Sequence, residues 1–264
     1  EEKTILSEHI TLSGIKKIGY IKEPRPLVLI LRNDGVLAIC LYLKSELANI
    51  ACFSRLVTDG LIKDFCITRN NNVEQVWLIV ERTINSQTKK YVEVMNESLF
   101  NGVEGWKWAS VQSDCAIKVA TSGLQVISGL EHLEGKEVSV TVDGILQTNK
   151  VVTDGKITLD KAGSVAGYAE IGIPFKKTIK TTRPKIEFPD GTSQGRIKGW
   201  SELSINLLNS QGGTLNKEPL PSEYFSGDHI VYDVGYDVAG QLLIESNISA
   251  PLKILSVSGK LDVN

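Results

Sequence analysis

The sequence lacks most of the signatures that mark a catalytic or metal-binding protein. Its 264 residues hold three histidines and four cysteines, and no C-x-x-C pair occurs among them. Zinc ligands normally come in close couples, so a zinc site is not indicated. A P-loop, a Rossmann glycine pattern and a calcium-loop signature are also missing. We therefore expect no cofactor and no bound metal.

Long hydrophobic runs and a strong charge imbalance are missing as well. No stretch of about 18 apolar residues exists, so no membrane-spanning segment is predicted. The formal net charge is −2, which gives no support to a nucleic-acid surface held by bulk electrostatics. No signal peptide opens the chain, and it begins Glu1-Glu2-Lys3 without an initiator Met. We expect a fragment of a longer protein.

The four cysteines lie in or beside hydrophobic stretches. They are Cys40, Cys52, Cys66 and Cys115. An even number permits disulfides, and this alternative stays open. The commoner interpretation is that they are buried, reduced thiols acting as small hydrophobic residues, which fits folding in a reducing cytoplasm.

Strand signals dominate what is present, and helical periodicity is nearly absent. Residues 27–31 and 36–42 are apolar runs around Asn33-Asp34-Gly35, which predicts a hairpin. A second hairpin is predicted from residues 76–83 and 91–95. Asp-Gly occurs five times, beginning at residues 34, 59, 143, 154 and 190. Such pairs favour tight turns between short strands. The predicted class is all-β.

Four segments are predicted along the chain. Residues 1–100 hold hairpins spaced like the blades of a β-propeller, of which they would form a part. Residues 101–123 connect them to residues 124–178, whose short, Gly-punctuated strands predict a small inserted β-barrel. Residues 179–264 predict a C-terminal β-sheet or sandwich.

One string has the form of a hydrolase motif. Gly191-Thr192-Ser193-Gln194-Gly195 matches G-x-S-x-G, which in a hydrolase follows a buried strand and precedes a helix. Here polar residues precede it and a strand pattern follows. The available histidine, His229, has Asp228 beside it, and neighbours on a strand point to opposite faces. The string is better explained as a flexible Gly-rich loop, so no catalytic residue is assigned.

Other chemistry has equally little support. The histidines His9, His132 and His229 are scattered, so a metal site would require them to converge on folding. Paired glycosidase carboxylates need not be neighbours in sequence, so a carbohydrate-cleaving enzyme remains an alternative.

Two groups of residues are candidates for binding. Trp106 and Trp108 would share one face of a strand, where they could form a sugar or base platform or, more often, fill an interface. A basic cluster surrounds the linker into the last segment and could face DNA phosphates, an acidic subunit or only solvent. Its members are Lys176, Lys177, Lys180, Arg183 and Lys185.

Many strings of the chain resemble, in the same order, the tail nozzle or tail tubular proteins of podovirus-type phages. Residues 32–37 resemble the family's R-x-D-G-x-L strand–turn–strand, and residues 128–138 are the most specific match. The other matching strings are residues 6–10, 14–15, 23–24, 58–60, 74–82, 91–93, 142–144, 155–159, 172–175, 179–181, 207–213 and 251–255. Residues 52–53 and 106–125 depart from the family pattern.

This resemblance implies a virion structural protein, folded in the host bacterial cytoplasm, without catalytic residues. Such proteins assemble as ring-shaped homo-oligomers, typically hexamers, beneath the portal and adaptor, and DNA passes along the axis during ejection. The resemblance also implies that further propeller blades lie outside residues 1–100. The alternative hypothesis is a glycan-binding or glycan-cleaving tail adhesin, based on Trp106 and Trp108; a serine hydrolase using Ser193 is a remote third.

Overall fold

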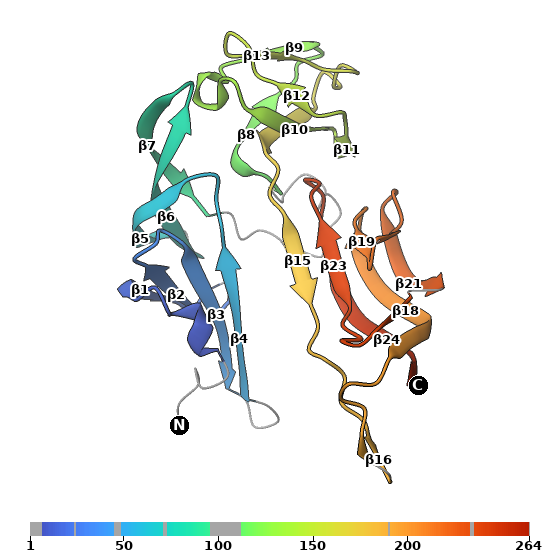
Figure 1. Cartoon of the computed structure of the whole chain (residues 1–264). Coiled ribbons are helices and arrows are strands. Elements are labelled where there is room, and N and C mark those ends of the chain that lie inside the picture. Colours follow the sequence, from blue (N-terminus) through green and yellow to red (C-terminus); the bar gives the residue numbers. More distant parts are fainter. Residues whose placement is uncertain are drawn as a thin grey trace. The chain divides into compact units, whose positions relative to one another are not determined.

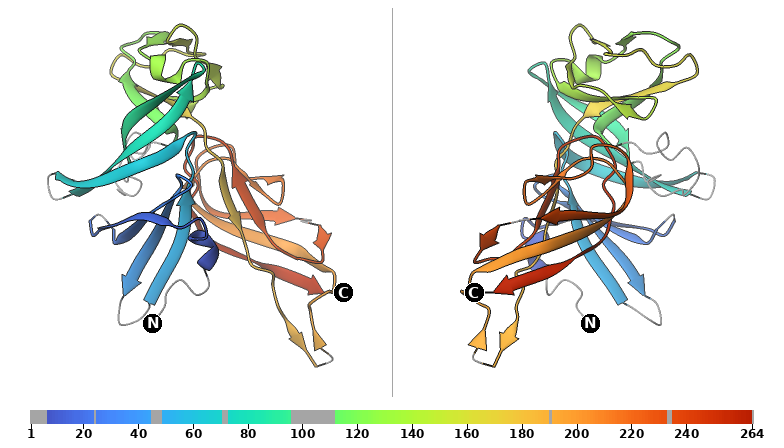
Figure 2. Two further views of the ribbon diagram at one scale, coloured as in Figure 1. Left: turned by 60° about the vertical axis from the view of Figure 1, so that its left-hand side comes forward. Right: turned by 90° about the vertical axis from the view of Figure 1, so that its right-hand side faces the viewer.

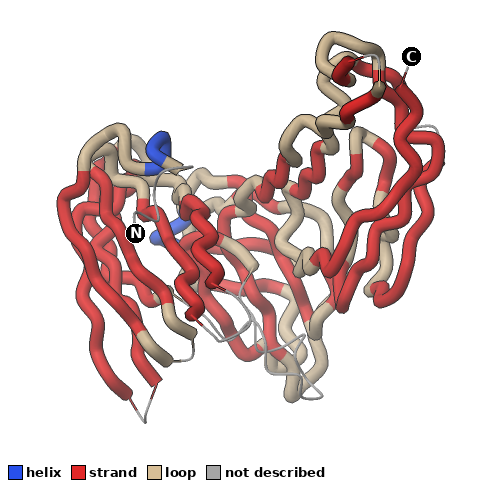
Figure 3. The backbone as a smooth tube through the Cα atoms, turned by 90° about the horizontal axis from the view of Figure 1, so that it is seen from below, coloured by secondary structure: helices blue, strands red, loops and turns tan. Residues whose placement is uncertain are grey.

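The computed structural model describes residues 7–23, 25–44, 49–70, 73–95, 112–189, 191–232 and 235–263. Two compact units divide the chain, Glu1–Ile173 and Pro174–Asn264. Strands make up nearly all of the regular structure, and the described residues hold two 3-10 turns, η1 (Glu8–Ile10) and η2 (Glu131–Leu133) (Figure 3). The predicted all-β class is confirmed. The described residues contain no helical segment that could span a bilayer.

The first unit begins with two antiparallel meanders (Figure 1). The first sheet contains β1 (Ile15–Ile21), β2 (Leu27–Arg32), β3 (Leu37–Lys44) and β4 (Asn49–Leu56), in that order. The second sheet contains β5 (Leu61–Asn70), β6 (Val73–Ile84) and β7 (Gln87–Val94). Both hairpins predicted from the sequence are present, and Asn85 and Ser86 turn the second with φ of 47° and 60°.

The two meanders share one hydrophobic core. The first sheet contributes Ile21, Leu29, Leu31 and Leu37, and the second contributes Ile62, Phe65, Val76, Leu78 and Val80. Strand alternation explains the choice, because every second residue of β2 and β6 points toward the other sheet. We call these facing surfaces the front faces and the opposite surfaces the back faces.

A third sheet follows in the first unit, in the strand order β11-β10-β14-β8, with β12 also paired to β10. Its strands are β8 (Asp114–Ala120), β10 (Glu137–Val142), β11 (Ile145–Leu146), β12 (Lys150–Val151) and β14 (Tyr168–Ile173). A separate ribbon joins β9 (Val126–Ser128) to β13 (Lys156–Thr158). Sheet and ribbon enclose one core that includes Leu130, Val140 and Ile171.

The prediction of a small closed barrel in this region is wrong. The edge strands β8 and β11 do not pair with each other, and the β9–β13 ribbon is hydrogen-bonded to neither. β11 and β12 pair with β10 over two residues each. Such short pairings cannot extend the sheet far enough for its two edges to meet and close a barrel. The Asp-Gly turns at 143 and 154 do form as predicted, with positive φ at both residues of each.

The second unit contains two four-stranded sheets. One has the order β15 (Lys177–Lys180), β23 (Leu243–Ser246), β19 (Thr214–Leu215) and β20 (Glu218–Pro219). In the other, the long β18 (Lys198–Ser210) pairs with β21 (Phe225–Tyr232), β22 (Tyr236–Asp237) and β24 (Ile254–Val263). Leu203, Ile205 and Leu207 of β18 share a core with Leu215 and Ile244, so residues of both sheets contribute to one core.

A short hairpin leaves these two sheets. β16 (Glu187–Phe188) pairs with β17 (Gly191–Thr192), and Figure 2 shows this hairpin extending from the rest of the second unit. It carries the G-x-S-x-G string.

Candidate functional site

The most elaborate polar arrangement in the described residues centres on Arg82. Arg82 lies on β6 between Val80 and Ile84, and all three are buried on the front face of the second sheet. The period-2 alternation of the strand therefore places a charged side chain at a core position. Its side chain is 0% exposed. A buried cation of this kind is costly unless it is paired and fully hydrogen-bonded.

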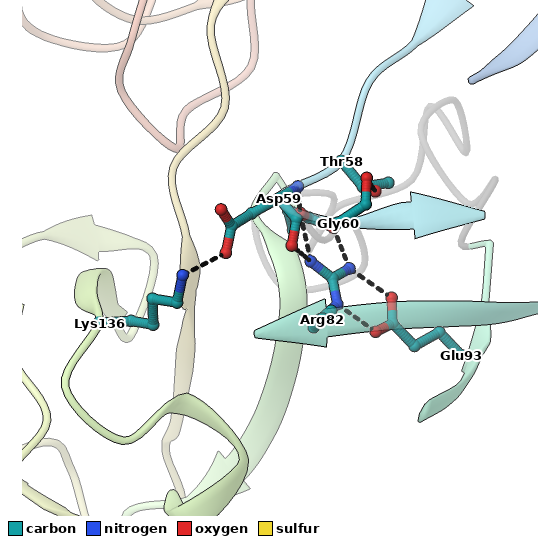
Figure 4. Close-up of polar contacts among 7 residues, drawn as sticks. Thr58, Asp59, Gly60, Arg82, Glu93 and Lys136 are labelled. Carbon is teal, nitrogen blue, oxygen red and sulfur yellow. Dashed lines mark hydrogen bonds and ion pairs between the residues drawn. The ribbon is translucent and has the colours of Figure 1, made fainter. Parts of the chain in front are cut away.

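Every N–H group of the Arg82 guanidinium has an acceptor. The fork toward β7 donates to both Glu93 oxygens, at 2.7 Å from Nε and 2.8 Å from Nη2. The fork toward β8 donates to both Asp114 oxygens, at 2.8 Å from Nη1 and 2.7 Å from Nη2. Nη1 also donates to the backbone carbonyl of Asp59 at 2.9 Å. Two bidentate carboxylates thus hold one guanidinium (Figure 4 shows the Glu93 side).

The connection between β4 and β5 extends this network. The Asp59 amide donates to Asp114 Oδ2 at 2.6 Å, and the Asp59 carboxylate pairs with Lys136 Nζ at 2.8 Å (Figure 4). Lys136 lies between η2 and β10 and so belongs to the part of the first unit that contains the third sheet. We call Asp59, Arg82, Glu93, Asp114 and Lys136 the ionic joint. It ties the two meanders to the third sheet within the first unit.

Burial and neighbouring charges shift the pKa values of three groups at or beside the joint. Burial alone would lower the pKa of Arg82, but the hydrogen bonds that it donates to Glu93 and Asp114 outweigh this effect and raise that pKa further above its ordinary value. Burial, together with the charge of Glu93, raises the pKa of the Cys115 thiol to about 12. Burial also lowers the pKa of His132. The joint thus holds a permanent cation beside an un-ionised thiol.

A shallow pocket of about 260 Å³ opens beside the joint. It is lined by Asp59, Gly60, Leu61, Glu81, Thr83, Thr88 and Lys136. The charged groups in its wall are already engaged, since Lys136 pairs with Asp59 and Glu81 pairs with Lys63 at 2.7 Å. An anionic or cationic ligand would have to displace one of these pairs, so the pocket is poorly suited to tight binding.

The predicted binding residues have separate positions. Trp106 and Trp108 lie outside the described residues. Lys176 pairs with Glu245 at 2.5 Å, and Lys185 pairs with Glu187 at 3.2 Å. Lys180 and Arg183 are exposed on β15 and the segment after it.

Lys177 has a structural position in the second unit. Its Nζ donates to the Ile248 carbonyl at 3.2 Å and to the Ala250 carbonyl, and it lies over the Phe175 ring. The basic cluster is therefore a row of individually engaged or solvated side chains along β15 and the following segment.

The G-x-S-x-G string does not present its serine. Ser193 is 0% exposed, and its Oγ accepts a hydrogen bond from the Ile186 amide at 2.9 Å. The Ser193 amide donates in return to the Ile186 carbonyl at 2.9 Å. The hydroxyl therefore closes the base of the β16–β17 hairpin, and a substrate cannot reach it in this conformation. His229 lies on β21 with an edge-on contact to Phe225.

The sequence interpretation gave Arg82 no role, although a signal was present. An arginine between Val80 and Ile84 on an alternating strand occupies a core position, and such a residue needs acidic partners. The partners could not be named, because Asp59 and Asp114 lie 23 and 32 residues away. Within the described residues, no group of three or more His, Cys, Asp or Glu side chains could hold a metal ion.

Comparison with protein-family models finds none that matches this chain, and no curated protein matches it either.

Proposed function

We propose that the chain is a structural component of a short phage tail, a nozzle or tail-tube protein that assembles as a ring. The observation that carries this proposal is the pair of successive antiparallel meanders that share one core through their front faces. Blades of a β-propeller are antiparallel meanders of this kind, arranged around a central channel. The ordered resemblance of residues 6–255 to tail nozzle proteins gives the same assignment.

The ionic joint supports a structural role over a catalytic one. It uses every guanidinium hydrogen to hold modules together, and the candidate serine is buried and hydrogen-bonded. In the proposed assembly the ring, expected to be a hexamer, contacts the portal, the adaptor and other tail proteins. DNA passes through it without sequence recognition.

Imaging of the full-length protein tests the proposal. Negative-stain micrographs and light scattering are expected to show a ring with a central hole, alone or with the tail partners. Monomers under both conditions would contradict it. That outcome would favour the glycan-binding adhesin instead, for which Trp106→Ala should abolish saturable binding to host-surface polysaccharide.

A further inference from the structure

The strand β8 contains a bulge directly beside the ionic joint. Its register against β14 shifts where two residues, Cys115 and Ala116, lie opposite Gly172. Cys115 has a φ of 51°, in the left-handed region that residues other than glycine rarely adopt. A bulge leaves its extra residue out of the regular ladder and re-aims the side chains beside it. Asp114 directly precedes this bulge, so the backbone at Cys115 sets how the Asp114 carboxylate meets Arg82.

His132 of η2 makes a hydrogen bond to the backbone of this bulge, at Cys115. Nε2 of the ring is buried and has no hydrogen-bond partner among the described residues, so the donor to the Cys115 carbonyl is Nδ1. A neutral imidazole carries one ring proton, and here that proton lies on Nδ1. His132 therefore supports the bulge with one nitrogen and buries the other nitrogen without a proton.

Charged and titratable groups surround this ring on four elements. They are the guanidinium of Arg82 on β6, the carboxylate of Glu93 on β7, the thiol of Cys115 on β8 and the carboxylate of Glu131 on η2. Glu93 already accepts hydrogen bonds from Arg82 and from the Cys115 thiol. Burial lowers the pKa of His132, and the attraction of Glu131 and Glu93 does not compensate for it. The site thus favours an uncharged ring more strongly than water does.

We propose that protonation of His132 loosens the attachment of the third sheet to the two meanders, so that the ionic joint is sensitive to mild acid. The added proton must go to Nε2, and a buried N–H group without an acceptor costs free energy. It also places a second positive charge near Arg82. Both costs disappear when η2 moves away from β8, but this movement removes the hydrogen bond that supports the Cys115 bulge, and Asp114 is then no longer held against Arg82. The inference goes beyond the proposed function, since it holds whether or not the chain forms a ring.

Hydrogen exchange at the Asp59 amide measures opening of the joint, because this amide donates to Asp114 Oδ2. The folded-state pKa of His132 lies below the ordinary value of 6.5, so the stabilisation is fully present above 6.5 and is lost as the pH falls through the folded-state value. The matched variant is His132→Asn, which keeps an N–H group near the position of Nδ1 but does not titrate. Between about pH 7.5 and 5.5, the Asp59 protection factor of the wild type should fall several-fold, and at most about tenfold, relative to that of His132→Asn.

Comparison with a second histidine assigns the effect to His132. His9→Asn, at an exposed histidine of η1 in the same unit, should follow the wild type. Burial raises the pKa of Glu170 on β14, whose carboxylate accepts hydrogen bonds from the two residues before Asp114, so this group also responds to acid. Its carboxyl is present in the wild type and in both variants, and its contribution cancels in the comparison. The same pH dependence in the wild type and in His132→Asn would overturn the proposal.

NMR titration of the wild-type protein tests the proposal without any substitution. The ring resonances of His132 give its pKa in the folded protein, which should lie below 6.5. The protection factor of the Asp59 amide should fall as the pH drops from 6.5 to that pKa and should become constant below it. A protection factor that does not change across this interval contradicts the proposal. A ring pKa at or above 6.5 contradicts it as well, because protonation would then not oppose the closed joint.

Discussion

At the scale of single residues, Arg82 is the side chain least expected at its position, because it is charged and the position faces the core. A hydrophobic residue at this core position would need no partners, whereas the arginine needs two carboxylates and a carbonyl from three different segments. Replacing a buried ion pair by apolar residues often costs little stability, provided that all of its charged members are replaced together. Removing the arginine alone leaves Glu93 and Asp114 facing each other without a cation.

Arg82→Met is therefore expected to lower the free energy of unfolding by about 3–5 kcal/mol. Arg82→Lys should recover only part of the loss, because an ammonium cannot form two bidentate pairs. Urea unfolding of both variants, with exposed Arg183→Met as the control, measures the effect. A loss within about 0.5 kcal/mol of the control would contradict a structural role for the joint.

Asp160 gives a residue-scale prediction in acid. Hydrogen bonds from Lys150 and from the Thr148 side chain and amide lower the pKa of its carboxyl from 3.8 to about 2. Because the folded-state pKa is depressed, the stabilisation is fully present above the unfolded value and is lost as the pH falls through about 2. The urea midpoints of wild type and Asp160→Asn should differ at pH 5 and converge toward pH 2. A difference that is constant over this range would show that the carboxylate contributes nothing as an ion.

At the scale of elements, turns were predicted correctly from the local sequence, whereas the pairing of distant strands was not. The hairpins at Asn33–Gly35 and Asn85–Ser86, and the Asp-Gly turns at 143 and 154, depend on a few adjacent residues that tolerate positive φ. The barrel prediction failed because a closed barrel requires β8 to pair with β11. The spacing of residues along the sequence does not show whether two distant strands pair. The joint was missed for the same reason, since its carboxylates lie on other strands.

The Asp59-Gly60 pair links β4 of the first sheet to β5 of the second sheet and does not close a hairpin. Gly60 has no positive φ; instead, a Cβ there would lie 2.6 Å from the Glu81 carbonyl oxygen and 2.9 Å from Arg82 Cγ. The glycine is thus required for close approach of the connection to β6, directly beside the ionic joint.

Gly60→Ala is expected to cost about 1–3 kcal/mol, since backbone must move to admit the methyl group. Thermal unfolding measures this, and Ser54→Ala at an exposed position of β4 serves as the control. The variant's amide protons at Asp59 and Leu61 should also exchange faster with solvent. Unchanged stability would mean that the connection has room the structure does not show.

At the scale of the whole molecule, the chain has two compact units, each with a hydrophobic core of its own. The sequence predicted a strand at residues 203–207 from their alternation of apolar and polar residues, and β18 contains that segment.

Separate cores predict separate responses to damage. Ile205 is 0% exposed in the core of the second unit, so Ile205→Ala should cost about 2–5 kcal/mol there. Hydrogen exchange resolved along the chain is expected to show lost protection in residues 174–264 and unchanged protection around Val140. Equal loss in both units would indicate that they unfold as one cooperative body.

The composition of the ionic joint also bears on the order in which the first unit folds. Glu93 is 11 residues from Arg82 and reaches it when the β6–β7 hairpin forms, whereas Asp114 is 32 residues away and arrives only with β8. Closing the longer loop costs more chain entropy, and its contacts form later. The nascent meander therefore carries an arginine with two N–H groups that only Asp114 will accept from, and we expect this contact to form last.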